Sequence, residues 1–406
     1  KRPKNSLNPN SIKIYFRDKI LPILNRILAK EDDVFFIESY LPLKTQLKLQ
    51  LKLGQRPTLW KSQNLSVVMV NPENRNWSLE KEDVSRFEKV IREMIPKNIP
   101  TAYLEGYSNL NEKIEKLHWP KYPKSIFTSN SFAGDDIFKA WAANKTKNGS
   151  QLIIGQHGGH IGTNLFSFHE EHQLRIADSY ISWGWNNKGR NNINPIGNLK
   201  CFENHVDYNP NGGALMVELS LPRYSYHMMA IPVAGQLLEY FDDQKIFLST
   251  LPIKLRKQVA LRLSRTDWGW NQAERWKESM PEIKLDNGLK DIKLAIRKSR
   301  LYISTYNATT FLESMTWNIP TIIFWNKKHW ELNDQAKTYF ELLEKAGIFH
   351  STPQSAAKKM IHIWDDVDSW WHSSEIQKVR KIFINQYSKI PNEPLKAIEK
   401  MLIKNN

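Results

Sequence analysis

The feature that most constrains the fold is a strand–turn–helix–strand pattern between residues 301 and 325. Residues 301–304 predict a short buried strand, 305–308 a polar turn, 309–317 a helix, and 320–325 a second strand. In parallel α/β sheets, ligands bind where a strand ends and the next helix begins. The pattern therefore predicts one half of a nucleotide-binding α/β domain.

Polar side chains gather where this helix begins. Free backbone N–H groups, hydroxyl groups and the helix dipole favour an anion at such a position, so we expect a donor phosphate there. A carboxylate one turn into the helix can accept the hydroxyls of a ribose. The predicted donor-binding residues of this stretch are Tyr306, Asn307, Thr309, Thr310 and Glu313. The alternative is that Asn307 or Thr309 only caps the helix and that Glu313 complements its dipole.

A second motif, G-Q-H-G-G-H-I-G, follows the predicted strand 151–155. Its glycines let the backbone around His157 approach a ligand closely. A neutral imidazole there suits a general base that removes a proton from an attacking hydroxyl. We predict His157 as a catalytic residue. The alternative is that it is a buried, hydrogen-bonded histidine beside a tight glycine turn. Gln156, His160 and Glu170 are the predicted acceptor-binding residues.

Several carboxylates raise the question of a metal. His169-Glu170-Glu171-His172 is not the H-E-x-x-H zinc pattern, because its histidines are three residues apart. The acidic D-x-D at Asp366 and Asp368 is interpreted as a helix start. We predict neither a metal nor a cofactor. Glu171 and Glu218 are predicted as catalytic carboxylates, and Asp178 is the partner to test beside Glu171.

The same alternation of strands and helices is predicted for the rest of the chain. Predicted strands at 34–38, 65–70, 125–128, 151–155 and 179–184 alternate with helices, and an Asn-, Gly- and Pro-rich linker covers 186–213. A strand at 214–219 and helices at 226–241, 252–263 and 291–298 follow, before a helical tail. The fold class is α/β, with two Rossmann-like doubly wound domains facing a central cleft. We divide the chain into a first domain, 1–205, a second domain, 206–390, and a C-terminal helix, 391–406.

Basic residues outnumber acidic ones. The 406 residues include 58 Lys and Arg against 42 Asp and Glu, a formal charge of +16. The basic residues are dispersed, which argues against nucleic acid and favours a phospholipid surface or an anionic nucleotide. Arg223 is predicted to face the cleft and bind the donor, with Arg262 and Arg265 as further cations. A single cysteine, Cys201, fits a reducing cytoplasm, and no apolar run is long enough to span a bilayer.

The chain begins without a methionine, as if it were cut from a longer protein. We expect a cytoplasmic protein with peripheral contact with the inner face of the plasma membrane.

Long motifs carry a family resemblance. G-Q-H-G-G-H-I-G with H-E-E-H and W-G-W, then S-T-Y-N-A-T-T-F-L-E and N-I-P-T-I-I-F-W-N-K-K-H-W-E-L, resemble transferases encoded in bacterial O-antigen and surface-polysaccharide gene clusters. More distantly, the His-Gly loop and the Thr-rich helix start resemble cytidine-nucleotide-using GT-B transferases, including teichoic-acid polymerases and transferases of Kdo and related ulosonic acids. The resemblance implies that His157 is the catalytic loop histidine and that Asn307, Thr309 and Thr310 hold the donor phosphate.

The resemblance implies a metal-independent GT-B glycosyltransferase, in which domain 1–205 binds the acceptor and domain 206–390 binds the nucleotide-sugar. The expected donor is a CMP-activated ulosonic acid of the Kdo or nonulosonic type, and the expected acceptor is a lipid-linked, O-antigen or capsule glycan. The alternatives are the same fold with a UDP-, GDP- or dTDP-hexose, a transferase with a CDP-polyol donor, and a non-catalytic glycan-binding subunit. We expect His157, Thr309 and Thr310 to face one another across the cleft.

Overall fold

The computed structural model describes residues 20–202, 205–224 and 228–403. The chain divides into two compact units. The first comprises Lys1–Ser39, Gln46–Ile154 and Leu402–Asn406, and the second comprises Tyr40–Thr45 and Gly155–Met401. Residues 155–401, including the whole predicted catalytic loop, thus belong to the second unit. The predicted boundary at residue 205 stays a prediction.

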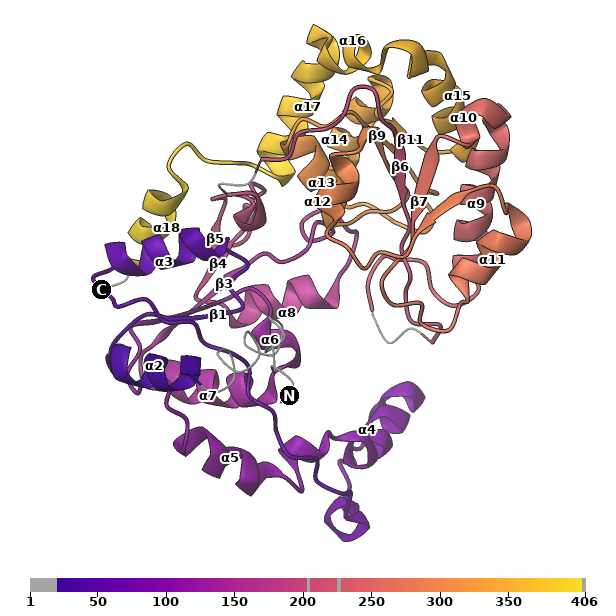
Figure 1. Cartoon of the computed structure of the whole chain (residues 1–406). Coiled ribbons are helices and arrows are strands. Elements are labelled where there is room, and N and C mark those ends of the chain that lie inside the picture. The colour runs from indigo at the N-terminus through magenta and orange to yellow at the C-terminus, as the bar shows by residue number, and fades with distance from the viewer. Residues whose placement is uncertain (1–19, 203–204, 225–227, 404–406) are drawn as a thin grey trace, which may run out of the picture. The chain divides into compact units, whose positions relative to one another are not determined.

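The first unit is built on parallel strands. β1 (Phe35–Ile37), β2 (Ser125–Thr128) and β3 (Gln151–Gly155) run in parallel, with Phe35 opposite Ile126 and Ile126 opposite Leu152. The strands are almost wholly buried, which explains their continuous apolar runs. The helices of this part of the chain are α2 (Leu21–Leu28), α3 (Leu43–Lys52), α4 (Arg86–Asn98), α5 (Tyr107–Glu115), α6 (Ser131–Gly134) and α7 (Asp136–Lys147) (Figure 1).

The second unit contains a six-stranded parallel sheet in the order β11-β10-β9-β6-β7-β8. Its strands are β6 (Gly213–Val217), β7 (Val259–Arg262), β8 (Lys284–Asp286), β9 (Ser299–Ser304), β10 (Thr321–Phe324) and β11 (Phe349–His350). β4 (Ser179–Ile181) and β5 (Ile193–Asn194) form a further parallel pair in this unit. Val217 lies opposite Ser304, so β6 and β9 end at the same edge.

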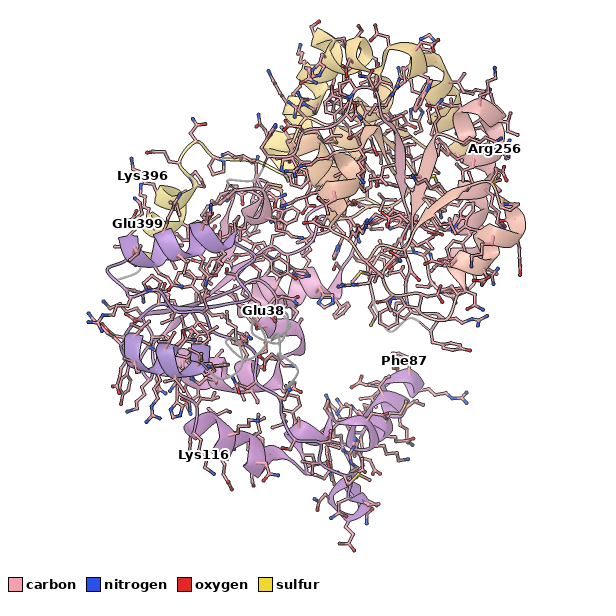
Figure 2. The ribbon with its side chains drawn as sticks, in the orientation of Figure 1. Glu38, Phe87, Lys116, Arg256, Lys396 and Glu399 are labelled. Atoms are coloured by element: carbon pink, nitrogen blue, oxygen red, sulfur yellow. The ribbon has the colours of Figure 1, made fainter. Side chains whose placement is uncertain are left out.

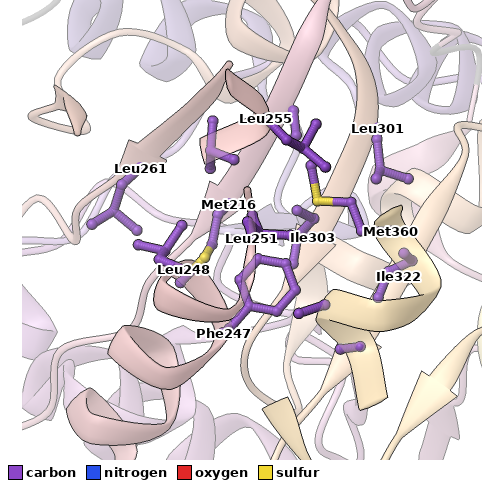
Figure 3. Close-up of a cluster of buried hydrophobic side chains, with 14 of the residues drawn as sticks. Met216, Phe247, Leu248, Leu251, Leu255, Leu261, Leu301, Ile303, Ile322 and Met360 are labelled. Atoms are coloured by element: carbon purple, nitrogen blue, oxygen red, sulfur yellow. The ribbon is translucent and has the colours of Figure 1, made fainter. Parts of the chain in front are cut away.

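Helices cover both faces of this sheet. Apolar residues of β6, β7, β9 and β10 pack with α9 (Gln236–Thr250) and α15 (Pro353–Ile363), and Phe247 stacks on Phe324 with ring centroids 4.9 Å apart (Figure 3). α12 (Ile292–Ile296) and α13 (Thr309–Thr316) lie on the side opposite α9 (Figure 1). The remaining helices are α8 (Phe168–Ile176), α10 (Ile253–Arg256), α11 (Gln272–Ser279), α14 (Asp334–Lys345), α16 (Val367–His372), α17 (Ser374–Tyr387) and α18 (Pro394–Ile403).

The predicted α/β class with parallel sheets is confirmed, and three predicted elements are wrong. Residues 65–70 form no strand, because no neighbouring strand pairs with them; Val67 is 92% exposed. Residues 252–263 are not one helix: α10 ends at Arg256, and β7 follows because both β6 and β8 pair with it. The helix predicted from 226 begins at Gln236, and residues 226–227 lie outside the described part of the chain.

Candidate functional site

The first turn of α13 follows β9 after a short polar turn, as predicted. Ala308 is the N-cap residue, and no side chain caps the helix. Thr309 and Thr310 are half-buried at its first two positions. The capping alternative for Asn307 and Thr309 is therefore wrong, since their side chains bond elsewhere. The amino end of α13 keeps its dipole and its first N–H groups without a side-chain acceptor.

Gln156 anchors the loop that follows β3. Its buried side-chain amide donates to the carbonyl oxygens of Gly158 (2.8 Å) and Ile161 (3.1 Å). Its Oε1 accepts from the backbone N–H of Trp183 (2.9 Å) and from the indole of Trp185 (2.8 Å). These four bonds use both donors and both acceptor positions of the amide. They explain the W-G-W motif and leave Gln156 to shape the loop.

The loop after β3 and the first turn of α13 interlock within the second unit. The Gly159 N–H donates to Thr309 Oγ1 at 3.2 Å. Asn307 Nδ2 donates to Thr163 Oγ1 at 3.0 Å and to Asn164 Oδ1 at 3.1 Å. A Cβ at residue 159 would lie 2.4 Å from the Ala308 carbonyl oxygen, so only glycine fits this approach. Two stretches about 150 residues apart in sequence thus form one constellation.

His157 lies on this interlocked loop. Its ring is half-buried and is surrounded edge-on by the rings of Tyr40, His160 and His169, with centroids 6.5, 6.3 and 6.1 Å away. His160 and His169 were singled out in the sequence as separate motifs, and the structure places both beside His157. The rings of His160 and His169 thus both lie beside that of His157.

Hydroxyl groups continue from the helix start into the sheet. Tyr302 donates from its hydroxyl to Thr310 Oγ1 at 2.7 Å, and the Tyr306 hydroxyl lies 3.3 Å from the same atom. Burial raises the pKa of both phenols, so both remain protonated. Glu313, also buried, lies 3.5 Å from Lys200 Nζ; burial raises the pKa of its carboxyl group, and Lys200 opposes the rise.

The two glutamates of the H-E-E-H motif have different surroundings. Glu170 accepts the Gly162 N–H at 2.7 Å, and burial raises the pKa of its carboxyl group. Glu171 is held by Arg175 (2.6 Å) and Arg190 (2.7 Å), which lower its pKa. Glu171 therefore stays ionised at neutral pH, whereas Asp178, its suggested partner, is exposed. A cavity of about 430 Å³ lies beside Glu170 and Glu171. It is lined by Asn164, Leu165, Phe166, Ser167, Phe168, Glu170, Glu171 and Met228.

Glu218 follows β6 and is 2% exposed, accepting a hydrogen bond from the Trp276 indole at 3.1 Å. Burial raises its pKa to about 8, so this carboxyl group is mainly protonated at pH 7. Arg223 is exposed and stacks over the Trp270 ring at 5.3 Å. Arg262 is committed to Asp286 at 2.6 Å.

Three further residues were singled out in the sequence: Arg265, Asp366 and Asp368. Arg265 is exposed. Asp366 caps α16 by accepting the Ser369 N–H, which confirms the helix-start interpretation, and Asp368 accepts the Tyr208 hydroxyl. Within the part of the chain that the structure describes, no group of three or more His, Cys, Asp or Glu residues could hold a metal ion. Likewise, none of the described helices is long and apolar enough to cross a membrane.

Sequence reasoning missed the residues that join the two motifs. Thr163 and Asn164 were passed over because their role depends on Asn307, which is distant in sequence. Asn333 was also missed; it donates to the Gly162 carbonyl oxygen at 2.9 Å and thus also holds this loop. The only local signal was a run of polar residues directly after the glycine-rich motif.

Comparison with solved structures gives distant likenesses. The wall teichoic acid polymerase TagF (H444N variant) has a TM-score of 0.44 and 11% identity, over 97% of this chain and 98% of that one. Acinetobacter baumannii MurG has a TM-score of 0.42 and 11% identity, over 92% and 99%. TarM has a TM-score of 0.42 and 13% identity over 70% of this chain, which spans 54% of TarM.

No curated protein matches the chain. Because every one of these TM-scores is below 0.5, the assignment of the chain rests on a family model. The model described as LIC12162 family transferase matches residues 1–402. With nearly its whole length matched, the chain belongs to the LIC12162 family of transferases.

Proposed function

We propose that this transferase is a GT-B-type glycosyltransferase whose site is the constellation of the 156–164 loop and the first turn of α13. The observation that carries the proposal is the interlock of Gly159 with Thr309 and of Asn307 with Thr163 and Asn164. It ties a half-buried histidine to a helix start that no side chain caps. A base and an anion site within one constellation are the two parts that group transfer from a nucleotide-sugar requires.

In this proposal His157 acts as the general base. Its neutral imidazole takes the proton of an acceptor hydroxyl, the hydroxyl oxygen bonds to the anomeric carbon, and the bond from that carbon to the donor phosphate oxygen breaks. The leaving phosphate keeps the electron pair of the broken bond. Because no metal is invoked, its charge must be met by the amino end of α13 and by hydroxyl donors.

Thr309 is suited to this second role. Its oxygen accepts the Gly159 N–H, which leaves the hydroxyl proton available for a phosphate oxygen. Asn307 Oδ1 is buried and receives no hydrogen bond from the described residues, so a ligand hydroxyl can use it. Tyr302 and Tyr306 position Thr310, and Glu313 remains the proposed ribose contact.

We assign the acceptor to the cavity of about 430 Å³ beside the loop. Phe166 and Phe168 are 51% and 40% exposed there, and aromatic faces of this kind pack against sugar rings. Glu170 lines the same cavity. Gln156, Glu171 and Glu218 are better explained as positioning residues. The side chain of Gln156 forms hydrogen bonds with backbone groups, and that of Glu171 pairs with two arginines. The side chain of Glu218 accepts a hydrogen bond from a buried indole.

The donor is proposed as a CMP-activated ulosonic acid and the acceptor as a bacterial surface-polysaccharide glycan. This choice rests on the resemblance of the sequence motifs. UDP-, GDP- and dTDP-hexoses and CDP-polyols use the same phosphate chemistry and are the competing donors in the test.

The test is transfer of radiolabelled sugar from each donor to a lipid-linked glycan, by the wild type, His157→Ala and His172→Ala. His172 lies in the same H-E-E-H region but is exposed, so it is the matched control. We expect transfer by the wild type and by His172→Ala and a loss of at least a hundredfold in His157→Ala. Equal activity of the two variants would remove His157 from the mechanism. No transfer from any donor would favour a non-catalytic glycan-binding subunit.

A further inference from the structure

The first unit carries an amphipathic helix whose apolar face is exposed. In α4, Phe87, Val90, Ile91, Met94 and Ile95 follow the spacing i, i+3, i+4, i+7 and i+8, which places them along one side of the helix. Their exposed fractions run from 75% at Phe87 to 36% at Ile95. In a globular protein this side would normally be buried against a core. Figure 2 shows Phe87 near the end of α4, with its side chain directed away from the helix.

The helix is held in place at its carboxyl end. The Arg75 guanidinium donates to the carbonyl oxygens of Pro96 (3.2 Å), Lys97 (3.0 Å) and Ile99 (2.9 Å). The same group forms a two-pronged ion pair with Glu105, at 2.7 and 2.9 Å. Both ion-pair side chains are almost fully buried. The carbonyl groups at the end of α4 are thus satisfied without use of the apolar face.

The neighbouring segment adds to the same kind of surface. Val67, Met69 and Val70 are 92%, 83% and 56% exposed, in the run that the sequence alone predicted as a strand. Trp77, between this run and α4, is 39% exposed. A large amount of exposed apolar surface on a stable protein marks a binding face.

Charge favours a lipid surface as the occupant. Arg92 is paired with Glu88, but Arg86, Lys89 and Lys97 have no ion pair within the described residues, against one such carboxylate, Glu93. A helix with an apolar side and an excess of basic residues binds in the plane of an anionic bilayer. A second copy of the chain would carry the same excess of basic residues and repel it. A second copy of the chain is therefore the weaker candidate.

We propose that α4 docks the protein on an anionic phospholipid surface, with Phe87, Ile91 and Met94 inserted among the lipids. This inference does not depend on the proposed reaction, because α4 belongs to the first unit and the constellation around His157 to the second. The excess of basic residues suggested contact with a phospholipid surface without indicating where on the protein it occurs. The proposal locates that contact at α4.

The test is sedimentation with vesicles of phosphatidylglycerol and phosphatidylcholine, or of phosphatidylcholine alone. We expect the wild type to bind the anionic vesicles and to bind them less at high salt. The double variant F87S/M94S should lose at least tenfold in binding. The control L43S/L51S removes two leucines of α3 with similar exposure, 56% and 61%, and should bind as the wild type does. Circular dichroism checks that both variants are folded.

A labelled variant gives a second, spectroscopic readout. The only cysteine, Cys201, is buried, so Phe87→Cys can be labelled selectively with an environment-sensitive dye, and Leu43→Cys serves as its control. Anionic vesicles should shift the emission of the dye to the blue at position 87 and not at position 43. Absence of vesicle binding by the wild type, equal losses in both double variants, or a wild-type dimer that F87S/M94S dissociates would each overturn the proposal.

Discussion

Gly159 is the position where the proposed site is most sensitive to a small change. In Gly159→Ala the new Cβ would lie 2.4 Å from the Ala308 carbonyl oxygen, 2.7 Å from its carbonyl carbon and 2.8 Å from Leu312 Cδ1. Two of these atoms belong to the backbone that begins α13, so the clash can be relieved only by moving the loop away from the helix. That movement lengthens the bond from the Gly159 N–H to Thr309.

The expected cost follows from the size of the clash. Adding a methyl group to a closely packed site costs about 1–3 kcal/mol. For a unit of this size we expect a fall in melting temperature of roughly 3–10 °C. If the nucleotide contacts Thr309, its Kd should rise by about tenfold for each 1.4 kcal/mol of strain that ligand binding must overcome.

The matched control is Gly235→Ala. Gly235 has helical dihedral angles, φ −59° and ψ −23°, and a Cβ there would have no atom within 4 Å. We expect the control to be as stable as the wild type or slightly more stable. Scanning calorimetry measures the melting temperatures, and isothermal titration measures nucleotide binding. If Gly159→Ala melts and binds as Gly235→Ala does, the close approach of loop and helix is not as described here.

Three further predictions rest on single contacts. Because burial raises the pKa of Glu218 to about 8, the unfolded state loses this proton first as pH rises; stability should fall by about 1.4 kcal/mol per pH unit between about pH 4.5 and 8, and Glu218→Gln should flatten that slope in urea titrations. Arg75 lowers the pKa of Glu105 to about 2, so this ion pair should hold above about pH 4.5 and weaken as pH falls toward 2; Arg75→Ala should speed hydrogen exchange in α4 at pH 7 but leave α7 unchanged. Phe166→Ala should raise the KM for the acceptor by several-fold with little change in the KM for the donor, whereas an equal rise in both would place the acceptor elsewhere.

The strands and the helix starts were largely predictable, because each depends on a short run of side chains. The turn from β9 to α13 and the strand before His157 were located within a residue or two. The conformations of residues 65–70 and 259–262 were predicted wrongly, because they depend on neighbouring strands. No strand pairs with residues 65–70, whereas residues 259–262 pair with a strand on each side.

The candidate site was predicted as two separate stretches, and the way they join could not be read from either one. Whether Asn307 caps its helix or bonds to Asn164 depends on a contact between residues more than 140 positions apart. The surroundings of Glu171 and Glu218 were equally hidden, since two arginines lower the pKa of the first carboxyl group and burial raises the pKa of the second. The residue types indicated which side chains could take part in the reaction, and the tertiary packing determines which of these side chains are free to do so.

The measurement that tests the central claim most directly is a thermal-shift comparison of CMP, CDP, UDP, GDP and dTDP on the wild type and on Thr309→Val. A ligand that binds only the folded state raises the melting temperature. We predict that CMP raises it most for the wild type and that this shift falls sharply in Thr309→Val, whose side chain has no hydroxyl group. A larger shift with another nucleotide would replace the proposed donor, and an undiminished shift in Thr309→Val would contradict the assignment of the phosphate to the start of α13.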